Sequence, residues 1–378
     1  MIYLDHNATT PVDDEVKNAV CDAIGVFGNP SSSHSAGREA HRLVEGARAA
    51  VARLIGATPD EVVFTSGGTE SNNLAVIGYA RSFGSGHIIS TRIEHPSVIN
   101  PLRHLEKEGF SITLVGTDRN GVVRPVDILD ELRPDTILVT VMHSNNETGV
   151  IQPVGEIAAI LKERGIALHT DLAQSAGKTP VDVQKLGCDM ATVVSHKFYG
   201  PKGVGALYIR SGVKVQPLMY GAGHERGLRP GTENIPAIAG FGKAAEIAAR
   251  DMTRRVEHAE RVTGMLYRRL LELIPDIMLN GEKAHRLPNT LNISIRGTVG
   301  ADIVDALKDD VAISAGSACH SGTCRPSDVL LAMGLSAPDA VSAVRISTGK
   351  DTSEEDVSMA SELIARAVES TRGSGRVI

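Results

Sequence analysis

Two residues that could take part in chemistry stand where apolar, strand-like stretches end. Lys197 follows "MATVV" and precedes a turn rich in glycine and proline, and Asp171 follows Ile166–Thr170 directly. A lysine partly removed from water can form a Schiff base, and a carboxylate at a strand end can pair with a protonated ring nitrogen. Each also has an ordinary alternative, as a surface lysine or as a helix N-cap aspartate.

A glycine-rich turn could hold the phosphate of a ligand. The stretch "VVFTSGGTESNN" leads from a strand through two glycines into the start of a helix. Free backbone N–H groups and the helix dipole at such a start favour a phosphate, and the hydroxyls of Ser66, Thr69 and Ser71 could donate as well. The stretch lacks the Gly-Lys-Ser/Thr end of a Walker motif, so alone it is a weak signal.

Polar residues follow two further strand-like stretches. His95 comes after "HIIST", and Asn145 and Asn146 lie in a polar turn after "TILVTVM". Loop histidines and turn asparagines are common without any catalytic role. Ligands of open α/β sheets, however, bind at the carboxyl ends of the strands. A lysine, an acid for a pyridinium nitrogen, a phosphate cradle and polar side chains at one such edge suit pyridoxal phosphate.

Alternating strands and helices would position these residues. The apolar stretches "HIIST", "SITLV", "TILVTVM", "IALHT", "MATVV" and "VGALYI" are typical of buried strands, and helical segments such as Val154–Arg164 lie between some of them. This order predicts an α/β domain with a mostly parallel sheet. After about Gly240 a long helical stretch could connect to a second domain, in which "NTLNISIR" and "AVRIS" predict strands that mix with helices.

The change of pattern indicates two domains. We predict a large cofactor-binding domain over residues 14–250. Residues 1–13 and 251–378 would form a smaller α+β domain, which carries a loop with two cysteines at about residues 314–328.

Composition and charge exclude several classes of protein. The chain has 378 residues, of which 42% are hydrophobic and 22% charged, and a formal net charge of −6. It has no basic patch for nucleic acid, no apolar stretch of about 18 residues for a membrane span and no signal-peptide pattern. Four cysteines do not suggest a secreted disulfide scaffold. We therefore expect a cytoplasmic protein without direct contact to nucleic acid or membrane.

A series of short motifs follows in order along almost the whole chain. They are "YLDHNATTP", "GNPSSSHSAGREA", "FTSGGTESNNLA", "EHPSV", "NNETGVIQP", "HTDLAQSAGK", "SHKFYGPKGVGALYIR", "GAGHERGLRPGTEN", "RLPNTLNISI", "GSACHSG" and "VRISTG". The chain is thereby similar to the group I cysteine desulfurases of the NifS/IscS type, in the class-V aminotransferase family. The resemblance implies the type I fold of pyridoxal-phosphate-dependent transferases, with a mostly parallel seven-stranded sheet flanked by helices and a smaller α+β domain.

The resemblance also implies roles around pyridoxal phosphate. Lys197 would form the Schiff base, Asp171 would pair with the ring nitrogen and Gln174 would contact the phenolic oxygen. His95 would stack on the ring and serve in proton transfer. The phosphate would be held by Gly68, Thr69, Ser195 and His196, with Thr232 reaching in from the second subunit of a homodimer.

The same resemblance assigns the substrate contacts and the nucleophile. Asn146, beside the cofactor, and Arg345 would orient the substrate, and Arg345 would pair with its carboxylate through two hydrogen bonds. Cys319 matches the family's catalytic cysteine because Pro326 follows it by seven residues. Cys324 falls where the family commonly has an ordinary residue.

A metal pair, a disulfide and a packing role are the other readings of the two cysteines. A zinc pair usually has a shorter spacing and two more ligands nearby, and a disulfide is not expected in a reducing compartment. Packing is the usual role of a buried cysteine, but the glycines and serines around Cys319 predict an exposed loop. We expect no metal site, apart from a transient iron–sulfur contact at Cys319.

The implied reaction takes sulfur from L-cysteine. It would give L-alanine and a persulfide on Cys319, which passes to an acceptor protein such as an iron–sulfur scaffold. His320 and the stretch "PSDVLL" resemble selenocysteine lyases, so L-selenocysteine is an alternative substrate. Desulfurases that supply DNA or tRNA modification belong to the same family. A non-enzymatic sulfur relay on the same fold is a third alternative, which the full set of cofactor residues disfavours.

Two positions depart from the family pattern. Most members have a serine two residues before the His–Lys pair, where this chain has Val194 and carries its hydroxyl at Ser195 instead. The phosphate contact is therefore expected to shift by one residue or to be lost. Leu172 is bulkier than the usual alanine, and we expect it either to tighten the site or to have little effect.

Overall fold

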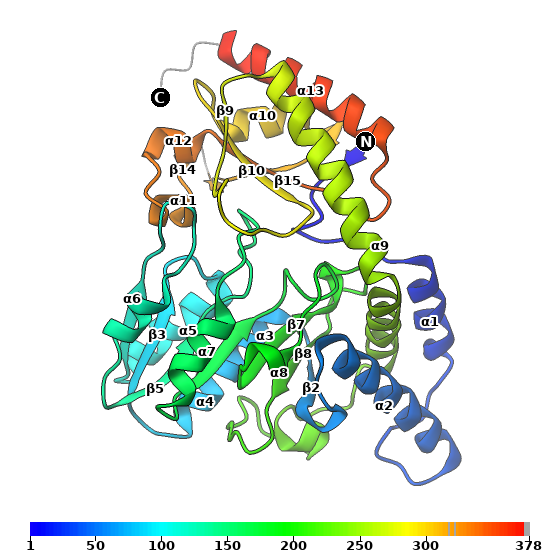
Figure 1. Cartoon of the computed structure of the whole chain (residues 1–378). Coiled ribbons are helices and arrows are strands. Elements are labelled where there is room, and N and C mark those ends of the chain that lie inside the picture. Colours follow the sequence, from blue (N-terminus) through cyan, green and yellow to red (C-terminus); the bar gives the residue numbers. More distant parts are fainter. Residues whose placement is uncertain (317, 321–322, 374–378) are drawn as a thin grey trace.

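The computed structural model describes residues 1–316, 318–320 and 323–373, and for 318–320 and 323–324 it describes the backbone alone (Figure 1). The larger part of the molecule is built on a seven-stranded sheet in the order β2-β8-β7-β6-β5-β3-β4. Six of these strands run parallel to one another, and only β8 is reversed. This confirms the predicted α/β fold with a mostly parallel sheet. The strand bounds are β2 (Val62–Thr65), β3 (His87–Thr91), β4 (Ser111–Val115), β5 (Thr136–Thr140), β6 (Ala167–Asp171), β7 (Met190–Val194) and β8 (Gly205–Ile209).

The apolar character of these strands follows from helices on both faces of the sheet. Every residue of β3, β6, β7 and β8 is buried. Side chains alternate between the faces, so Ile88 and Ile89 of β3 belong to two different cores. One face packs on α2 (Ser35–Ile55) and α7 (Val154–Lys162). The other packs on α5 (Pro96–Lys107) and on a helix made of α3 (Gly68–Asn73), a π-helical turn (Leu74–Gly78) and α4 (Tyr79–Arg81).

Shorter elements connect the large sheet. They are α1 (Asp14–Ile24), α6 (Pro125–Asp130), α8 (Val183–Leu186) and single 3-10 turns at Pro59–Glu61, Ser195–Lys197 and His224–Gly227.

A second, antiparallel sheet has the order β12-β15-β10-β9. Its own core is formed with α10 (Gly300–Leu307), α13 (Glu354–Gly373) and the second half of α9 (Ile235–Leu273), and Leu4 from the N-terminal segment belongs to it. Bounds in this part are β1 (Ile2–Tyr3), β9 (Ile277–Leu279), β10 (Thr290–Ile295), α10 (Gly300–Leu307), β11 (Val311–Ala312), β12 (Ser314–Ala315), β13 (Ala318–His320), β14 (Thr323–Arg325), α11 (Asp328–Ala332), α12 (Ala337–Val341), β15 (Ala343–Ser347) and α13 (Glu354–Gly373).

The helix α9 (Ile235–Leu273) runs from one sheet to the other (Figure 1). Phe241 and Ala244 in its first half are buried against the large sheet's core, whereas Val262 and Leu266 in its second half are buried in the small sheet's core. The helix is continuous through residue 250, so the domain boundary near that residue stays a prediction. Within the described residues, no helix has the length and apolar character that a membrane span needs.

Candidate active site

A cavity of about 390 Å³ opens at the carboxyl ends of β6 and β7. The expected edge of the sheet is therefore where the polar side chains meet. Of the residues singled out from the sequence, those that line the cavity are Gly68, Thr69, His95, Asn146, Asp171, Gln174, His196, Lys197 and Arg345. They come from segments that are far apart in the chain, and Arg345 comes from the small sheet.

Lys197 ends the 3-10 turn that follows β7, and its amine is held by backbone carbonyls. The Nζ atom donates to the oxygens of Asn7 at 2.7 Å and Ala8 at 2.8 Å. Burial lowers the pKa of Lys197 to about 8, and the positive charge of Arg345 acts in the same direction. An amine with this pKa is uncharged in a sizeable fraction of molecules near neutral pH, which is the form that attacks a carbonyl carbon.

Asp171 is the last residue of β6 and is 6% exposed. Its Oδ2 accepts from Nδ2 of Asn72 at 2.8 Å, and its Oδ1 accepts from the backbone N–H of Ala173 at 2.8 Å. No lysine or arginine forms an ion pair with it among the described residues. A buried carboxylate with only neutral donors is suited to a cationic partner in the cavity.

His95 is the N-cap of α5, which fixes its ring. Its Nδ1 accepts from the backbone N–H of Ser97 at 3.1 Å and lies 2.7 Å from the hydroxyl of the same residue. Because Nδ1 is an acceptor, the proton of the neutral ring is on Nε2. Burial lowers the pKa of His95, although the negative charge of Asp171 opposes this effect. The ring is therefore neutral at neutral pH and can accept or donate one proton in the cavity.

The glycine-rich turn forms the start of α3, as predicted from its sequence. A Cβ at Gly68 would lie 2.7 Å from Cγ2 of Val194, so a side chain there would collide with the neighbouring strand. The first N–H groups of the helix have no partner within it, and Thr69 adds a hydroxyl at the cavity wall. This end of the cavity can bind a phosphate.

Arg345 lies on β15, and both terminal nitrogens of its guanidinium donate hydrogen bonds within the protein. Its Nη2 donates to Oδ1 of Asp5 at 2.7 Å and to the hydroxyl of Ser314 at 2.8 Å, and Nη1 donates to the oxygen of Asn146 at 3.1 Å. Its Nε is buried and has no partner among the described residues. Asp5 fixes the guanidinium while leaving donor capacity for a carboxylate of a ligand.

Gln174 is held by residues that the sequence did not single out. Its Nε2 donates to the oxygen of Asn7 at 3.0 Å, and its Oε1 accepts from Nζ of Lys178 at 2.8 Å. Lys178 also donates to Oδ1 of Asn7 at 2.8 Å, and burial depresses its pKa well below the ordinary value. Asn7 lies in the motif "DHNATTP" and Lys178 in "AQSAGK". Both motifs belong to the family pattern, and this was the one signal in the sequence that could have identified the two residues as part of the site.

Two expected phosphate ligands lie outside the cavity. The hydroxyl of Ser195 is buried without a partner among the described residues, and a Cβ on Gly200 would lie only 2.1 Å from it. The side chain of Val194 lines the cavity instead, so the structure does not support a phosphate contact by Ser195. Thr232 is exposed and does not line the cavity of its own chain. Leu172 is fully buried in the core of the large sheet and does not narrow the site.

The cysteine loop is described by its backbone. Strands β13 and β14 form an antiparallel pair in which Cys319 stands opposite Cys324. The side chains of both cysteines and of His320 lie outside the described part of the structure, so the role of Cys319 stays a prediction. Among the side chains that are described, no group of three or more His, Cys, Asp and Glu residues could hold a metal ion.

Known proteins resemble the chain over nearly its whole length. The family model of class-V aminotransferases matches residues 2–359. A cysteine desulfurase IscS of Dictyoglomus turgidum is 44% identical over 98% of this chain and 95% of its own length. A second relative, cysteine desulfurase IscS 1 of Archaeoglobus fulgidus, is 44% identical over 98% of both chains.

A solved structure agrees with these matches. A NifS-like protein has a TM-score of 0.90 and 36% sequence identity, and the match covers 97% of this chain and 98% of that one. The seven-stranded sheet, the edge on which the polar residues meet and the matched residues 2–359 lead to one assignment. The chain belongs to the class-V aminotransferase family.

Proposed function

We propose that the chain is a pyridoxal-phosphate-dependent cysteine desulfurase, which converts L-cysteine to L-alanine and transfers the sulfur to Cys319. The observation that carries this proposal is the meeting of three groups in one cavity. They are the amine of Lys197, the carboxylate of Asp171 and the guanidinium of Arg345. The relatives are named cysteine desulfurases, and a related structure titled SspA in complex with cysteine has a TM-score of 0.81 and 34% identity.

The residues of the cavity fit pyridoxal phosphate. Asp171 has no cationic partner among the described residues, the start of α3 at Gly68 lines the cavity close to Val194, and Lys197 has a lowered pKa. Lys197 would hold the aldehyde carbon, Asp171 the ring nitrogen, and the start of α3 with Thr69 and His196 the phosphate. When bound, the cofactor supplies a sink for the electron pair that is left at Cα of the substrate.

Side chains of the protein bind the substrate, transfer protons and attack the substrate sulfur. Arg345 binds the substrate carboxylate through donor groups that Asp5 and Asn146 leave in a fixed orientation. The amine of Lys197 or the ring of His95 would take the proton from Cα, and either can return a proton later. The thiolate of Cys319 attacks the substrate sulfur. A sulfur–sulfur bond then forms as the carbon–sulfur bond breaks, and the released electron pair is protonated to give the methyl group of alanine.

The pKa of Lys197 makes cofactor uptake dependent on pH. The uncharged amine attacks the aldehyde, and its fraction rises with pH up to the pKa, which is about 8. The second-order rate of reconstitution of the apoprotein is therefore expected to rise about tenfold per pH unit below that value and to level off above it. Stopped-flow absorbance of the bound cofactor measures this rate. A rate that is flat between neutral pH and the pKa would contradict the assigned role.

Replacing Cys319 by alanine is the direct test of the proposed nucleophile. The variant is expected to bind the cofactor and L-cysteine normally but to lose sulfide release in the presence of a thiol reductant, because no thiolate attacks the substrate sulfur. Cys324→Ala is the matched control, since Cys324 stands opposite Cys319 in the hairpin. Sulfide release by the Cys319 variant at the rate of the unmodified enzyme would refute the nucleophile.

The substrate, acceptor and assembly are further parts of the proposal. Comparing kcat/KM for L-selenocysteine and L-cysteine on one preparation tests the substrate. A strong preference for the selenium compound, with a rate independent of Cys319, would favour a lyase.

We propose a homodimer in which Thr232, exposed and outside its own cavity, completes the partner's phosphate site. The acceptor would be a protein such as an iron–sulfur scaffold, and a reducing cytoplasm would keep the Cys319 thiol free.

A further inference from the structure

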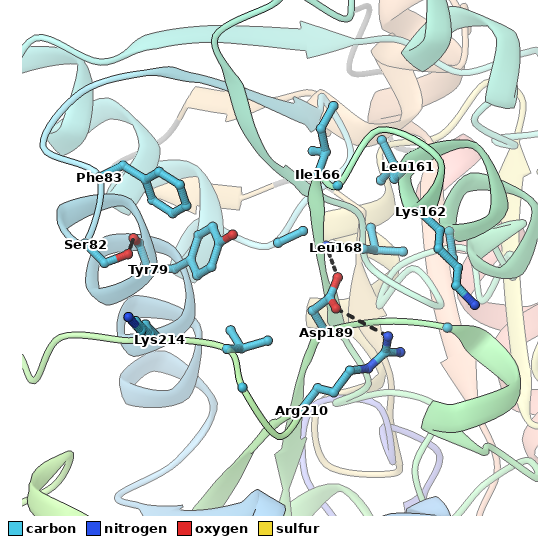
Figure 2. Close-up of a pocket in the computed structure, with 16 residues that line it drawn as sticks. Tyr79, Ser82, Phe83, Leu161, Lys162, Ile166, Leu168, Asp189, Arg210 and Lys214 are labelled. Atoms are coloured by element: carbon cyan, nitrogen blue, oxygen red, sulfur yellow. Dashed lines mark hydrogen bonds and ion pairs between the residues drawn. The ribbon is translucent and has the colours of Figure 1, made fainter.

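A second cavity, of about 500 Å³, lies at the opposite edge of the large sheet. It opens beside the amino ends of β6 and β7, whose carboxyl ends carry Asp171 and Lys197. Figure 2 shows its three walls: α4 and the turn after it on one side, the segment from α7 to β6 on the other, and the segment after β8 below them. None of the residues that line it takes part in the proposed reaction.

The two upper walls of this cavity are largely apolar. The rings of Tyr79 and Phe83 are 5.1 Å apart and tilted by 51° on one side. Leu161 and Ile166 lie on the other side (Figure 2). Phe83 is 52% exposed, so its ring is accessible to a ligand at the mouth of the cavity. The gap between the two walls suits a flat apolar group.

The charged residues of the cavity are mostly cations. Asp189 accepts from the backbone N–H of Leu168 at 2.8 Å and lies 3.5 Å from Nη1 of Arg210. Lys162 and Lys214 lie on opposite sides of the view, and their ammonium groups have no hydrogen bond or ion pair among the described residues (Figure 2). Three cations and one carboxylate leave an excess of positive charge, which favours an anion.

The hydroxyl of a buried tyrosine points into the same gap without a protein partner. Tyr79 is 8% exposed, and its hydroxyl makes no hydrogen bond with any described residue. Figure 2 shows this hydroxyl directed toward the space between the walls. Burial raises the pKa of Tyr79 to about 12, so the oxygen keeps its proton and can donate it. The oxygen itself is not closed off from water, so water can hydrate it in the free protein, and an acceptor of a ligand in the cavity would replace that water.

One helix connects this cavity to the phosphate cradle. It begins at Gly68 in the cradle, passes through the π-helical turn Leu74–Gly78 and ends with Tyr79–Arg81 at the second cavity. π-Helical turns are rare and occur often at functional sites. The segment that carries Lys214 is fixed to the same helix, because the backbone N–H of Gln216 donates to the oxygen of Gly78 at 2.9 Å.

We propose that this cavity binds a small organic anion with a flat apolar body, and that its occupancy is transmitted along the helix from Tyr79 to the phosphate cradle. The rings of Tyr79 and Phe83 contact the apolar body. The Tyr79 hydroxyl and the ammonium groups of Lys162 and Lys214 bind the acidic group. The binding site is independent of the proposed function, whereas its coupling to the cradle rests on that function.

The absence of tryptophan from the chain provides a reporter. In a Phe83→Trp variant of the holoenzyme, the single indole ring stands at the mouth of the cavity. The probe is 1-anilinonaphthalene-8-sulfonate, which is a sulfonate on fused apolar rings. Titration is expected to give saturable energy transfer from the introduced indole to the probe. Absence of saturation would overturn the proposal.

Charge and hydroxyl variants place the probe in the cavity. Lys162→Glu with Lys214→Glu is expected to weaken binding by at least about tenfold. Lys283→Glu with Lys308→Glu makes the same charge change outside the cavity and is expected to leave binding unchanged. Tyr79→Phe is expected to weaken it about fivefold without loss of thermal stability, because the hydroxyl makes no hydrogen bond with any described residue. Equal effects of the two lysine pairs would overturn the proposed site.

Equilibrium dialysis of pyridoxal phosphate tests the coupling. Saturating probe is expected to lower the dissociation constant of the cofactor by at least about threefold, because a ligand that orders Tyr79 and Lys214 also orders the helix that begins at Gly68. The Lys162→Glu, Lys214→Glu variant should lose this effect. An unchanged or raised constant would overturn the coupling. An enzyme without activity on L-cysteine would refute the proposed function but would leave the probe titration as it stands.

Discussion

Lys197→Ala is expected to lower the rate of alanine formation from L-cysteine by on the order of 10³-fold or more, through loss of the Schiff-base amine and of a proton carrier at Cα. Asp171, Gly68 and Thr69 remain in this variant, so pyridoxal phosphate should still bind, although without a covalent bond. Single-turnover kinetics of alanine formation measures the loss. Lys202→Ala, an exposed lysine in the turn after Lys197, is the matched control and should keep its activity.

The covalent bond itself gives a second readout of this substitution. Borohydride should fix the cofactor on the peptide that contains Lys197 in the unmodified enzyme and fix none in Lys197→Ala. Lys178 is the informative alternative, because it is a buried lysine with a depressed pKa that shares Asn7 with Lys197. Reduction that attaches the cofactor to Lys178 in the unmodified enzyme would show that the wrong lysine has been assigned.

Arg48→Met is expected to cause the largest loss of stability. Arg48 Nη1 and Nη2 each lie 2.7 Å from an oxygen of Glu225, and the Glu225 side chain is 2% exposed. Glu225 also accepts from the backbone N–H of Phe64 at 2.7 Å. Removing the arginine leaves a buried carboxylate without its counter-ion, and breaking such a pair costs about 3–5 kcal/mol.

The same ion pair holds an unusual backbone conformation. Glu225 and Arg226 have φ angles of 46° and 59°, in the left-handed region that residues other than glycine rarely adopt. They lie in the segment that leads to Thr232, so Arg48→Met should also weaken cofactor binding if Thr232 serves the partner's site.

Unfolding of the apoprotein in urea measures the effect of Arg48→Met on stability. Arg250→Met is the control, because Arg250 is exposed and its ion pairs with Glu15 and Asp251 lie at the surface, where such pairs contribute little. A double variant in which Glu225→Leu accompanies Arg48→Met should recover part of the loss, since it removes the stranded charge. An equal, small shift of the unfolding midpoint for Arg48→Met and Arg250→Met would contradict the assignment.

The edge of the sheet that carries the site was predictable because it depends on a simple pattern. Strands β6 and β7 are short, fully buried and followed at once by the turns that carry the site, with Asp171 closing β6 and Lys197 just beyond β7. Parallel strands bring such ends together whatever the rest of the fold does. The apolar residues on both sides of β3 likewise required helices on two faces of the sheet.

The contacts between distant segments were not predictable in this way. Asn72 pairs with Asp171, and Asp5 with Arg345, only because the fold brings together residues separated by 99 and 340 positions. No local pattern encodes such distances. For Ser195 the sequence was misleading. Its position beside His196 suggested a hydroxyl in the cavity, whereas the 3-10 turn after β7 directs the side chain toward Gly200.

The second cavity illustrates the same limit on a larger scale. Its walls come from three segments, and Tyr79, Asp189 and Lys214 share no motif. The sequence shows each as an ordinary residue near the end of a helix or strand. Only the packing of α4, the segment from α7 to β6 and the segment after β8 gathers the cations beside the hydroxyl of Tyr79.

The central claim is that sulfur from L-cysteine is transferred to Cys319 on a pyridoxal-phosphate enzyme whose cofactor is bound by Lys197. Mass spectrometry of the peptides after one turnover with L-cysteine, without reductant, tests it most directly. The predicted result is one additional sulfur atom on the peptide with Cys319 and one equivalent of alanine. Alanine formed without a sulfur on Cys319, or with the sulfur on Cys324 in a Cys319→Ala variant at an unchanged rate, would contradict the claim.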